Sequence, residues 1–388
     1  MNAIAPGDAR ALLRALVATD SRNPDLVPGA PGEGAVARLL ADVLQSWGFD
    51  VELQEALPNR PNVIARVGAR NRSSKTLLFN GHVDVVAVDG MTHAPFDAEE
   101  RDGRLYGRGA SDMKAGVAAM CAAAQRAAAR GLAGELIVTA VVDEEFKSAG
   151  TRAVIESGIR ADAAIVTEPT QLAIMPAHRG FTWVTVTCRG RAAHGSRYDL
   201  GIDAILHASH IMTAIDDFQR NQLALRTHPL LGHASLHAGT ISGGLGWSTY
   251  PDSCRLEIER RTLPGERGAQ VVDEIVAVCD RVRQRVPALD VTVEHVFSQL
   301  PSDVSVDAPI CAALSNAMRE RGEPVHIAGM SAWTDAALLN AAGIPAICFG
   351  PGDMTLAHAN AEWAELGEVD RACDVLAQLA LSWCGARS

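Results

Sequence analysis

The spacing of hydrophobic positions over the first 177 residues predicts helices that alternate with strands. Residues 8–18 and 34–48 have apolar positions at helical spacing, and 115–131 is an Ala-rich helical run. Near-continuous apolar runs predict strands, which are PNVIARV, TLLFN, GELIVTAVVDEE and ADAAIVTEP. Strands without polar alternation are buried on both faces, so this part of the chain predicts a parallel-rich sheet covered by helices on both sides.

The pattern changes after residue 177 and returns near residue 300. The chain between these points predicts, in order, the alternating strand FTWVTVTCRG, a helix at 201–218, strands at 235–242 and 253–262, a helix at 268–286 and a strand at 290–297. This β-α-β-β-α-β order is that of the split βαβ arrangement. The remaining chain predicts the strand IPAICFG and helices at 308–321, 334–342 and 367–384.

These elements predict an α/β protein with two domains. We expect a catalytic domain of residues 1–177 and 298–388, with a mostly parallel mixed sheet flanked by helices. Residues 178–297 are expected to form an inserted, smaller α+β domain. A length of 388 residues is enough for two domains, and a hydrophobic content of 48% is that of a globular protein.

The net charge and the placement of cysteines indicate which partners and which cellular compartment this protein could have. The net charge is −11 and there is no basic run, which argues against nucleic acid or an anionic membrane as a partner. We find no apolar stretch of about 18 residues that could span a membrane, and no signal peptide at the N-terminus. The eight cysteines are dispersed without a CxxC pair, so we expect free thiols in a reducing cytoplasm.

Residues able to bind metals follow several of the predicted strands. They are His82, Asp112, Glu144, Glu145, Glu168 and His358. Ligands of open α/β sheets gather at the carboxyl ends of the strands. Two imidazoles and three carboxylates suit a pair of zinc-like cations that share one bridging carboxylate, and the remaining carboxylate is available as a general base.

The shorter motifs have simpler interpretations when each is taken alone. His82 and Asp84 lie two residues apart at a strand end, so Asp84 could hold the second ring nitrogen of His82. Both could equally be a solvent-facing polar pair. Asp112, in GRGASDMKAG, could cap the helix that follows it. Arg108 and Lys114 in the same motif could be ordinary surface charges.

Glu144 and Glu145 follow the strongest predicted strand. Adjacent side chains of an extended segment point opposite ways, so one carboxylate could bind a metal while the other faces the reacting water. With Asp143 they could instead form a solvated acidic turn, but the recurrence of such residues at several strand ends favours a metal site.

Two cations about 3.5–4 Å apart, bridged by Asp112, would lower the pKa of a water toward about 7. Glu144 would take its proton and deliver it to the leaving amine.

The motifs together resemble the M20 family of metallopeptidases and deacylases. The matching segments run across almost the whole chain and are GHVDVV, GRGASDMKAG, DEEFKSAG, EPT, RAAHGS, ISGG with YPD, ERRTLPGE, SAWTDAALL, GIPAICFGPG and AHANAEW. The resemblance implies a di-zinc catalytic domain and an inserted lid domain that mediates dimerisation. Glu144 matches the family's general base, and Asp84 matches the acid behind the first histidine. The implied ligands are His82, Asp112 and Glu168 for one metal, and Asp112, Glu145 and His358 for the other.

The resemblance also implies substrate-binding residues in the inserted domain. His194 matches a lid histidine that reaches the partner subunit's active site and stabilises the oxyanion, or it is a plain loop residue. Arg261 matches an arginine associated with the substrate carboxylate, and Arg260 is the competing choice. Gly243 and Gly244 fit a turn near the substrate or merely a tight turn.

Departures from the family pattern concern specificity, not chemistry. Ser248 stands where many relatives have Asn, Tyr198 where they often have Pro, and Ala361 where an acid is common. We therefore expect a cytoplasmic, homodimeric hydrolase with two Zn²⁺, or with Co²⁺ or Mn²⁺, that cleaves N-acyl amino acids in the manner of acetylornithine deacetylase. A dipeptidase or carboxypeptidase of the same family is the alternative, and a catalytically silent metal-binding or partner-binding protein is the alternative of another class.

Overall fold

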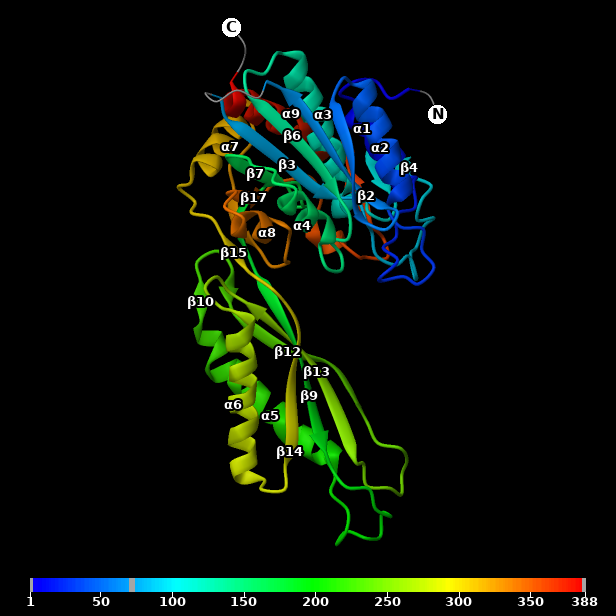
Figure 1. The fold of residues 1–388 in the computed structure, drawn as a ribbon, viewed down its shortest axis with the longest axis vertical. Helices are drawn as coiled ribbons and strands as arrows, with labels where there is room; N and C mark the ends of the chain where they lie inside the picture. Colours follow the sequence, from blue (N-terminus) through cyan, green and yellow to red (C-terminus); the bar gives the residue numbers. More distant parts are fainter. Residues whose placement is uncertain (1–2, 70–73, 386–388) are drawn as a thin grey trace. The chain divides into compact units, whose positions relative to one another are not determined.

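The computed structural model describes residues 3–69 and 74–385, and this chain divides into two units (Figure 1). The first unit is made from three segments, Met1–Pro176, Val304–Ala328 and Thr334–Ser388. The second unit is made from Ala177–Asp303 and the short segment Gly329–Trp333. In the sequence, both segments of the second unit therefore lie between segments of the first unit, which is the order of an inserted domain.

The first unit is built on a mixed sheet whose central strands are parallel. The strand order within this unit is β1-β2-β6-β3-β7-β17-β8. Parallel pairing joins β6, β3, β7 and β17, while β1, β2 and β8 pair antiparallel. The bounds are β1 Asp50–Leu57, β2 Arg60–Gly68, β3 Thr76–His82, β6 Glu135–Val141, β7 Ala163–Val166, β8 Ile174–His178 and β17 Ala346–Cys348. Of two further short strands, β15 Ser302–Asp303 belongs to the second unit, and β16 Ile327–Met330 spans the boundary between segments of the two units.

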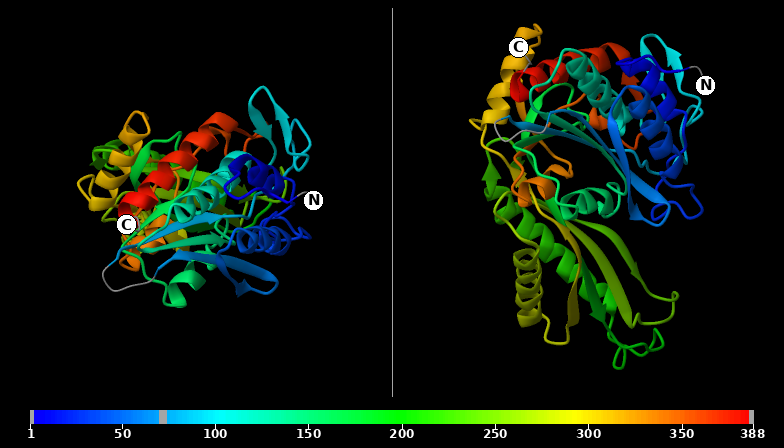
Figure 2. Two further views of the ribbon diagram at one scale, coloured as in Figure 1. Left: turned by 90° about the horizontal axis from the view of Figure 1, so that it is seen from above. Right: turned by 45° about the horizontal axis from the view of Figure 1, so that its top comes forward.

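Helices cover both faces of this sheet, as the apolar strands require. On one face α3 and α9 pack against each other and against β3 and β6, while α4 lies on the other face (Figures 1 and 2). Residues of β3 and β6 are almost entirely buried between them. The bounds are α1 Ala9–Val17, α2 Gly34–Ser46, α3 Ala115–Ala129, α4 Ala149–Glu156, α7 Pro309–Glu320, α8 Ala336–Ala341 and α9 Leu366–Cys384.

Helix α3 approaches the sheet closely because its facing residues are small. A Cβ atom added at Gly116 would lie 1.8 Å from the carbonyl oxygen of Thr167, so only glycine fits there. A small three-stranded sheet, β4 Glu99–Arg101, β5 Arg104–Tyr106 and β18 Trp363–Glu365, lies beside this framework. Close packing therefore fixes α3, and with it Asp112, relative to the segment that carries Glu168.

The second unit has the predicted β-α-β-β-α-β order. Its antiparallel sheet has the strand order β12-β13-β9-β14, and α5 and α6 contribute to one apolar core with it. Core residues such as Val184 and Val186 alternate along β9 with residues on the opposite face of the sheet, such as Trp183. The bounds are β9 Gly180–Arg189, α5 Ala204–Asn221, β12 Ser235–Gly243, β13 Ser253–Thr262, α6 Gly268–Arg285 and β14 Asp290–Gln299.

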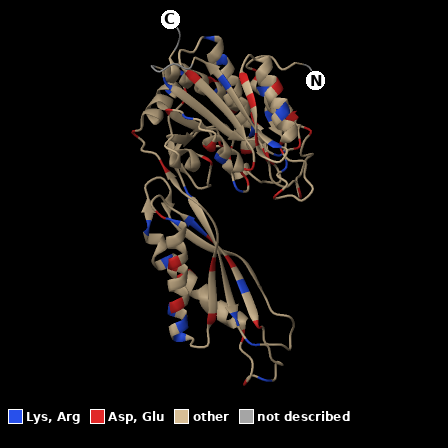
Figure 3. Ribbon diagram, in the orientation of Figure 1, with Lys and Arg blue, Asp and Glu red and all other residues tan. Residues whose placement is uncertain are grey.

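The structure confirms the predicted fold class, a mixed α/β sheet flanked by helices together with a smaller α+β unit. Acidic and basic residues are interspersed along helices such as α6 (Figure 3). Within the described residues, no helix has the length and apolar character needed to cross a membrane.

Candidate metal centre

The predicted ligands lie where neighbouring parallel strands end. His82 is the last residue of β3, and Glu168 follows the adjacent strand β7 by two residues. Glu144 and Glu145 follow β6, which pairs with β3 on its other side. Because the carboxyl ends of parallel strands meet at one edge of a sheet, these side chains converge there.

Two overlapping groups of ligand atoms result, and Asp112 belongs to both. His82, Asp112 and Glu168 form one group, and Asp112, Glu145 and His358 form the other, with the ligand atoms of each group within 4.8 Å of one another. One carboxylate oxygen of Asp112 lies 3.2 Å from Nε2 of His82, and the other lies 3.5 Å from Nε2 of His358. The structure thus brings together all five residues that the sequence nominated as ligands.

The composition and burial of the two groups fit a pair of divalent cations. Burial and the repulsion of neighbouring carboxylates raise the pKa of Glu168 well above its usual value. Burial likewise raises the pKa of Glu145, against its hydrogen bond to His358. Carboxylates that repel one another in a buried site are compensated by bound cations. Imidazole nitrogen and carboxylate oxygen are ligands that Zn²⁺, Co²⁺ and Mn²⁺ accept.

The two histidines are held as partners of these carboxylates. Burial disfavours the charged form of His82, but hydrogen bonds to Asp112 and Asp84 outweigh it and raise its pKa well above the usual value. The hydrogen bond to Glu145 raises the pKa of His358 to about 9. Protons on these ring nitrogens occupy the positions that metals would take, so metal binding would release them.

Glu144 lies beside both groups without belonging to either. Its carboxylate is 11% exposed, and Oε2 lies 3.9 Å from Nε2 of His82. Burial, opposed by His82 and reinforced by the negative charges of Glu168, Asp335 and Glu145, raises its pKa well above the usual value. Glu144 is therefore a buried carboxylate that adjoins the candidate ligands but belongs to neither group.

Glu144 and Glu145 diverge for a different reason from the one expected. They lie in the turn after β6, not in an extended strand end, so the alternation of strand side chains does not apply. Glu145 instead turns toward His358, with Oε2 and Nε2 3.0 Å apart, while Glu144 turns toward His82. The acidic turn exists, but its glutamates are largely buried and not solvated.

Asp84 fixes this turn relative to His82. Its Oδ1 accepts a hydrogen bond from the backbone N–H of Glu144, and its Oδ2 accepts one from that of Glu145, each at 3.1 Å. Nδ1 of His82 lies 3.5 Å from Oδ1 and is hydrogen-bonded to the backbone carbonyl oxygen of Asp84 at 3.1 Å. Burial raises the pKa of Asp84, but His82 and these donors outweigh burial and lower it, so the carboxylate is charged.

A second layer of buried polar groups supports Asp84. The side-chain amide of Asn23 donates to Asp84 at 2.9 Å and to Asp143 at 3.1 Å. Arg60 donates to Asp143 at 3.1 Å and to both oxygens of the fully buried Glu33, at 2.6 and 2.7 Å. This network joins the region before α2 to the turn after β6, so the turn that carries Glu144 and Glu145 is held against the core.

The sequence did not assign a role to Glu362, which holds the loop that carries Asp112. Its buried carboxylate accepts hydrogen bonds from the backbone N–H groups of Gly109, Ser111 and Asp112 at 2.9–3.1 Å, and from Arg108 at 2.7 Å. Arg108 is therefore a buried partner of Glu362, and its interpretation as a surface charge is wrong. The presence of an acidic residue four positions after His358 was the one sequence feature that could have pointed to Glu362.

Lys114 is likewise not a surface charge. It is fully buried, and its ammonium donates to the carbonyl oxygens of Leu16 and Thr19 at 2.9 and 3.0 Å. These carbonyls lie at the C-terminal end of α1, where a cation is favoured by the helix dipole. Lys114 thus connects the Asp112 loop to α1.

The side chain of Asp112 faces His82, so the alternative that it acts as a helix cap is wrong.

The remaining nominated residues belong to the second unit, and their part in a site stays a prediction. His194 is exposed, with Nδ1 2.8 Å from the hydroxyl of Ser196. Gly243 ends β12, where it pairs with Cys254, and Gly244 follows with a φ of +83°. The loop beyond it contains Ser248, whose carbonyl oxygen accepts from Gly195 N–H at 2.7 Å.

The structure distinguishes the two adjacent arginines of β13. Arg260 is fully buried and donates to Glu266 at 2.6 Å, so it is a structural residue of this unit. The side chain of Arg261 is 32% exposed and lies on the face of the sheet away from the core. Of the two, only Arg261 is open to a ligand.

Comparisons with known proteins agree with this geometry. The chain matches the model of peptidase family M20/M25/M40 over residues 78–382. It is 30% identical over 388 residues to an acetylornithine deacetylase of Myxococcus xanthus, covering 97% of this chain and 98% of that protein. It is 28% identical over 391 residues to N-formyl-4-amino-5-aminomethyl-2-methylpyrimidine deformylase of Bacillus subtilis (strain 168), covering 93% and 92%. A solved dinuclear metal-binding M20 peptidase of Bacillus subtilis has the same fold, with a TM-score of 0.73, 18% identity and 97% of each chain covered.

The chain therefore belongs to peptidase family M20/M25/M40, and it is a hydrolase that acts on amide bonds. The family resemblance found in the sequence is confirmed.

Removing the carboxylate of Glu362 should destabilise the first unit strongly. In Glu362→Ala the guanidinium of Arg108 and three backbone N–H groups lose their buried acceptor, so we expect a loss of about 3–5 kcal/mol in the free energy of unfolding. The measurement is urea denaturation of the metal-free protein. Glu365→Ala, an exposed glutamate three residues later, should change this free energy by less than about 0.5 kcal/mol. Equal effects of the two variants would contradict the assigned role of Glu362.

Proposed function

We propose that this chain is a dinuclear zinc-dependent amidohydrolase that releases the acyl group from N-acyl amino acids. The observation that carries the proposal is the pair of ligand groups that share Asp112, with Glu144 beside them. The full-length similarity to an acetylornithine deacetylase supports an acylated amino acid as the substrate. The eight buried, free cysteines support a reducing cytoplasm as its compartment.

The proposed ligands divide between the two cations as the geometry groups them. His82, Asp112 and Glu168 would hold one ion, and Asp112, Glu145 and His358 the other, with Co²⁺ or Mn²⁺ as possible substitutes for Zn²⁺. Bound cations of this kind polarise the scissile carbonyl and lower the pKa of a water. Asp84 would orient the ring of His82, and Glu362 would position the backbone of Asp112.

Glu144 is the proposed general base and acid. It would accept a proton from the attacking water as the new carbon–oxygen bond forms, and deliver it to the nitrogen when the carbon–nitrogen bond breaks. The products are a carboxylic acid and a free amino acid. Its place beside both ligand groups, without membership in either, supports this role.

Residues of the second unit are proposed to bind the substrate. Arg261 would bind the carboxylate of the amino acid, because a guanidinium can form two parallel hydrogen bonds to it. His194 would donate to the oxyanion from a neighbouring subunit. Gly243, Gly244 and Ser248 would lie near the substrate. The exposure of His194 and Arg261 supports their availability.

Activity measurements with a defined substrate panel test this function. The zinc-loaded protein should hydrolyse one class among N-acetyl, N-succinyl and N-formyl amino acids, and a chelator should abolish the release of amine. Preference for dipeptides would favour the dipeptidase or carboxypeptidase alternative. Absence of turnover in a protein that holds two metal ions would contradict the proposal and favour a silent metal-binding protein.

Glu144→Gln isolates the proton-transfer role. The amide cannot accept a proton, so we expect kcat to fall by about 10²–10⁴-fold while the bound metal content stays the same. Glu156→Gln, at an exposed position on α4, is the matched control and should retain full activity. Full activity of Glu144→Gln would refute the assigned base.

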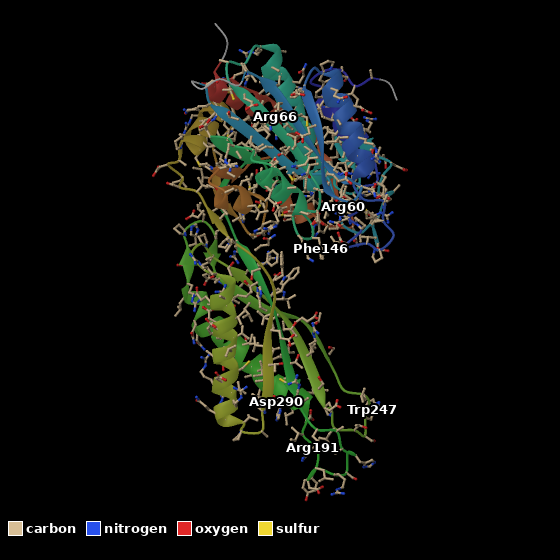
Figure 4. All side chains as sticks on the ribbon, viewed as in Figure 1. Arg60, Arg66, Phe146, Arg191, Trp247 and Asp290 are labelled. Carbon is tan, nitrogen blue, oxygen red and sulfur yellow. The ribbon has the colours of Figure 1, made fainter. Side chains whose placement is uncertain are left out.

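A homodimer through the second unit is the proposed assembly. The edge strand β12 is largely exposed, and Ile241 lies on it with 53% exposure. Trp247, on the loop between β12 and β13, is fully exposed (Figure 4). An unpaired strand edge with apolar neighbours favours pairing with another chain.

Light scattering tests this assembly. The protein should have the mass of a dimer, and Ile241→Glu should weaken the dimer by at least about tenfold in Kd, since a charge would be buried at the paired edge. Leu53→Glu, at an exposed position on β1 of the first unit, should leave the mass unchanged. A monomeric wild-type protein would contradict the proposal and leave His194 without its role across the dimer.

A further inference from the structure

The face of the second unit's sheet that α5 and α6 leave uncovered carries a cluster of aromatic rings. Phe181 and Trp183 lie two residues apart on β9, and their ring centroids are 5.0 Å apart with an angle of 35° between the planes. Phe297, opposite Trp183 on β14, lies 5.8 Å from Trp183 and 6.0 Å from Phe181. The ring of Trp333 is perpendicular to that of Phe181, with 6.4 Å between the centroids. We call Phe181, Trp183, Phe297 and Trp333 the aromatic shelf.

Arg261 is fixed at the border of the aromatic shelf. It is paired with Phe181 across the β13–β9 ladder, and its guanidinium carbon lies 5.5 Å from the centre of that ring. Its Nε donates to Oε1 of Glu259 at 2.7 Å. Among the residues that the structure describes, none bonds the two terminal nitrogens of Arg261. These nitrogens form a fork that can bind a carboxylate with two parallel hydrogen bonds.

Glu259 holds the arginine and the outermost ring together. Its second oxygen, Oε2, accepts a hydrogen bond from Nε1 of Trp183 at 3.0 Å. One carboxylate therefore fixes both the direction of the guanidinium fork and the plane of the indole, which is 37% exposed. Because the Arg261 guanidinium and the Trp183 indole are already held by one residue, they lose little conformational entropy when a ligand binds.

Space for a ligand exists beside Trp183 and Glu259. A cavity of about 340 Å³ is lined by Trp183, Gly239, Arg255, Glu257, Glu259 and Val296, among others. This volume lies within the range of small-molecule sites. The cavity wall combines an aromatic side chain with apolar, polar and charged groups, all within the second unit.

The local charge disfavours a cationic ligand at the aromatic shelf. Burial and the positive charges of Arg261 and Arg260 lower the pKa of Arg179, which directly precedes β9 beside the end of β13. Glu259 already pairs with Arg261 and is not free to receive an ammonium group. A cationic side chain, although able to stack on an aromatic ring, would meet this repulsion.

We propose that Arg261 and the aromatic shelf form a subsite for a carboxylate joined by a short linker to a planar ring, as in the amino-acid half of an N-acylated aromatic amino acid. The carboxylate binds the fork of Arg261, and the ring stacks on Trp183. This inference rests on the proposed hydrolysis of N-acyl amino acids and names the class of amino acid that it favours. Glu259 is the positioning residue of the subsite.

Calorimetric binding and steady-state kinetics together test the subsite. Binding of N-acetyl-L-phenylalanine, N-acetyl-L-alanine and N-acetyl-L-ornithine is measured with the zinc-loaded Glu144→Gln protein, and KM and kcat are measured with active protein. We expect the phenylalanine derivative to bind about tenfold more tightly than the other two, which is the size of one aromatic stacking contact. Trp183→Ala should remove this preference and leave the affinity for the alanine derivative unchanged. Trp183→Phe should keep most of it.

A second pair of variants tests the carboxylate. Arg261→Ala should weaken binding of the phenylalanine and alanine derivatives alike, by at least about tenfold. Arg220→Ala is the matched control, because Arg220 is an exposed arginine of α5 that pairs with Asp216, as Arg261 pairs with Glu259, but does not line the cavity. It should leave the affinities unchanged.

The outcomes separate this inference from the proposed function. Equal affinities for the phenylalanine and alanine derivatives, a preference for the ornithine derivative, or equal losses in Arg220→Ala and Arg261→Ala would each overturn the subsite. If the phenylalanine derivative binds as expected but no N-acyl amino acid is hydrolysed, the subsite stands and the proposed reaction fails. If N-acyl amino acids are hydrolysed with no change in Trp183→Ala, the reaction stands and the subsite fails.

Discussion

The arrangement of the candidate metal ligands depends on how the buried carboxylate of Asp84 is satisfied. A carboxylate without partners in a protein interior is strongly unfavourable, and Asp84 is fully buried. Its partners are the ring of His82, the amide of Asn23 and the backbone N–H groups of Glu144 and Glu145. One buried charge therefore sets the first histidine, the second-group carboxylate and the general-base candidate relative to one another.

Hydrogen bonds to buried carboxylates hold the candidate ligands that do not lie in a strand. His82 belongs to β3, but Glu144 and Glu145 lie in a turn, and Asp112 lies in the segment Ala110–Lys114 before α3. Turns carry fewer constraints than strands, so side chains must supply them. Asp84 holds the turn after β6, and Glu362 holds the backbone of the Asp112 segment.

The sequence predicted the fold and nominated ligand candidates that the structure brings together, because both depend on local pattern and order. Continuous apolar runs such as 76–80 marked the buried parallel strands, and metal-capable residues at their ends marked the site. Edge strand β1, with charged residues and a mostly exposed face, lacked such a run and was not predicted. The short strands β15 and β16 also offered too few residues for a periodic pattern.

Buried charges were not predictable, because their partners are distant in the sequence. Lys114 looked like a surface residue, and its burial follows from two carbonyl groups at the end of α1. Glu362 and Arg108 pair across more than two hundred residues. Short motifs indicate which residue types are present, but the neutralisation of a buried charge becomes visible only when the chain is folded.

The metal content of the purified protein tests the central claim, which is a two-cation centre bridged by Asp112. After dialysis against zinc and removal of excess ion, elemental analysis should find two zinc ions per chain in the wild-type protein and one in His358→Ala, which keeps the group of His82, Asp112 and Glu168. Asp112→Ala, which damages both groups, should retain neither ion. One ion per chain in the wild-type protein, or two in Asp112→Ala, would contradict the shared-carboxylate centre.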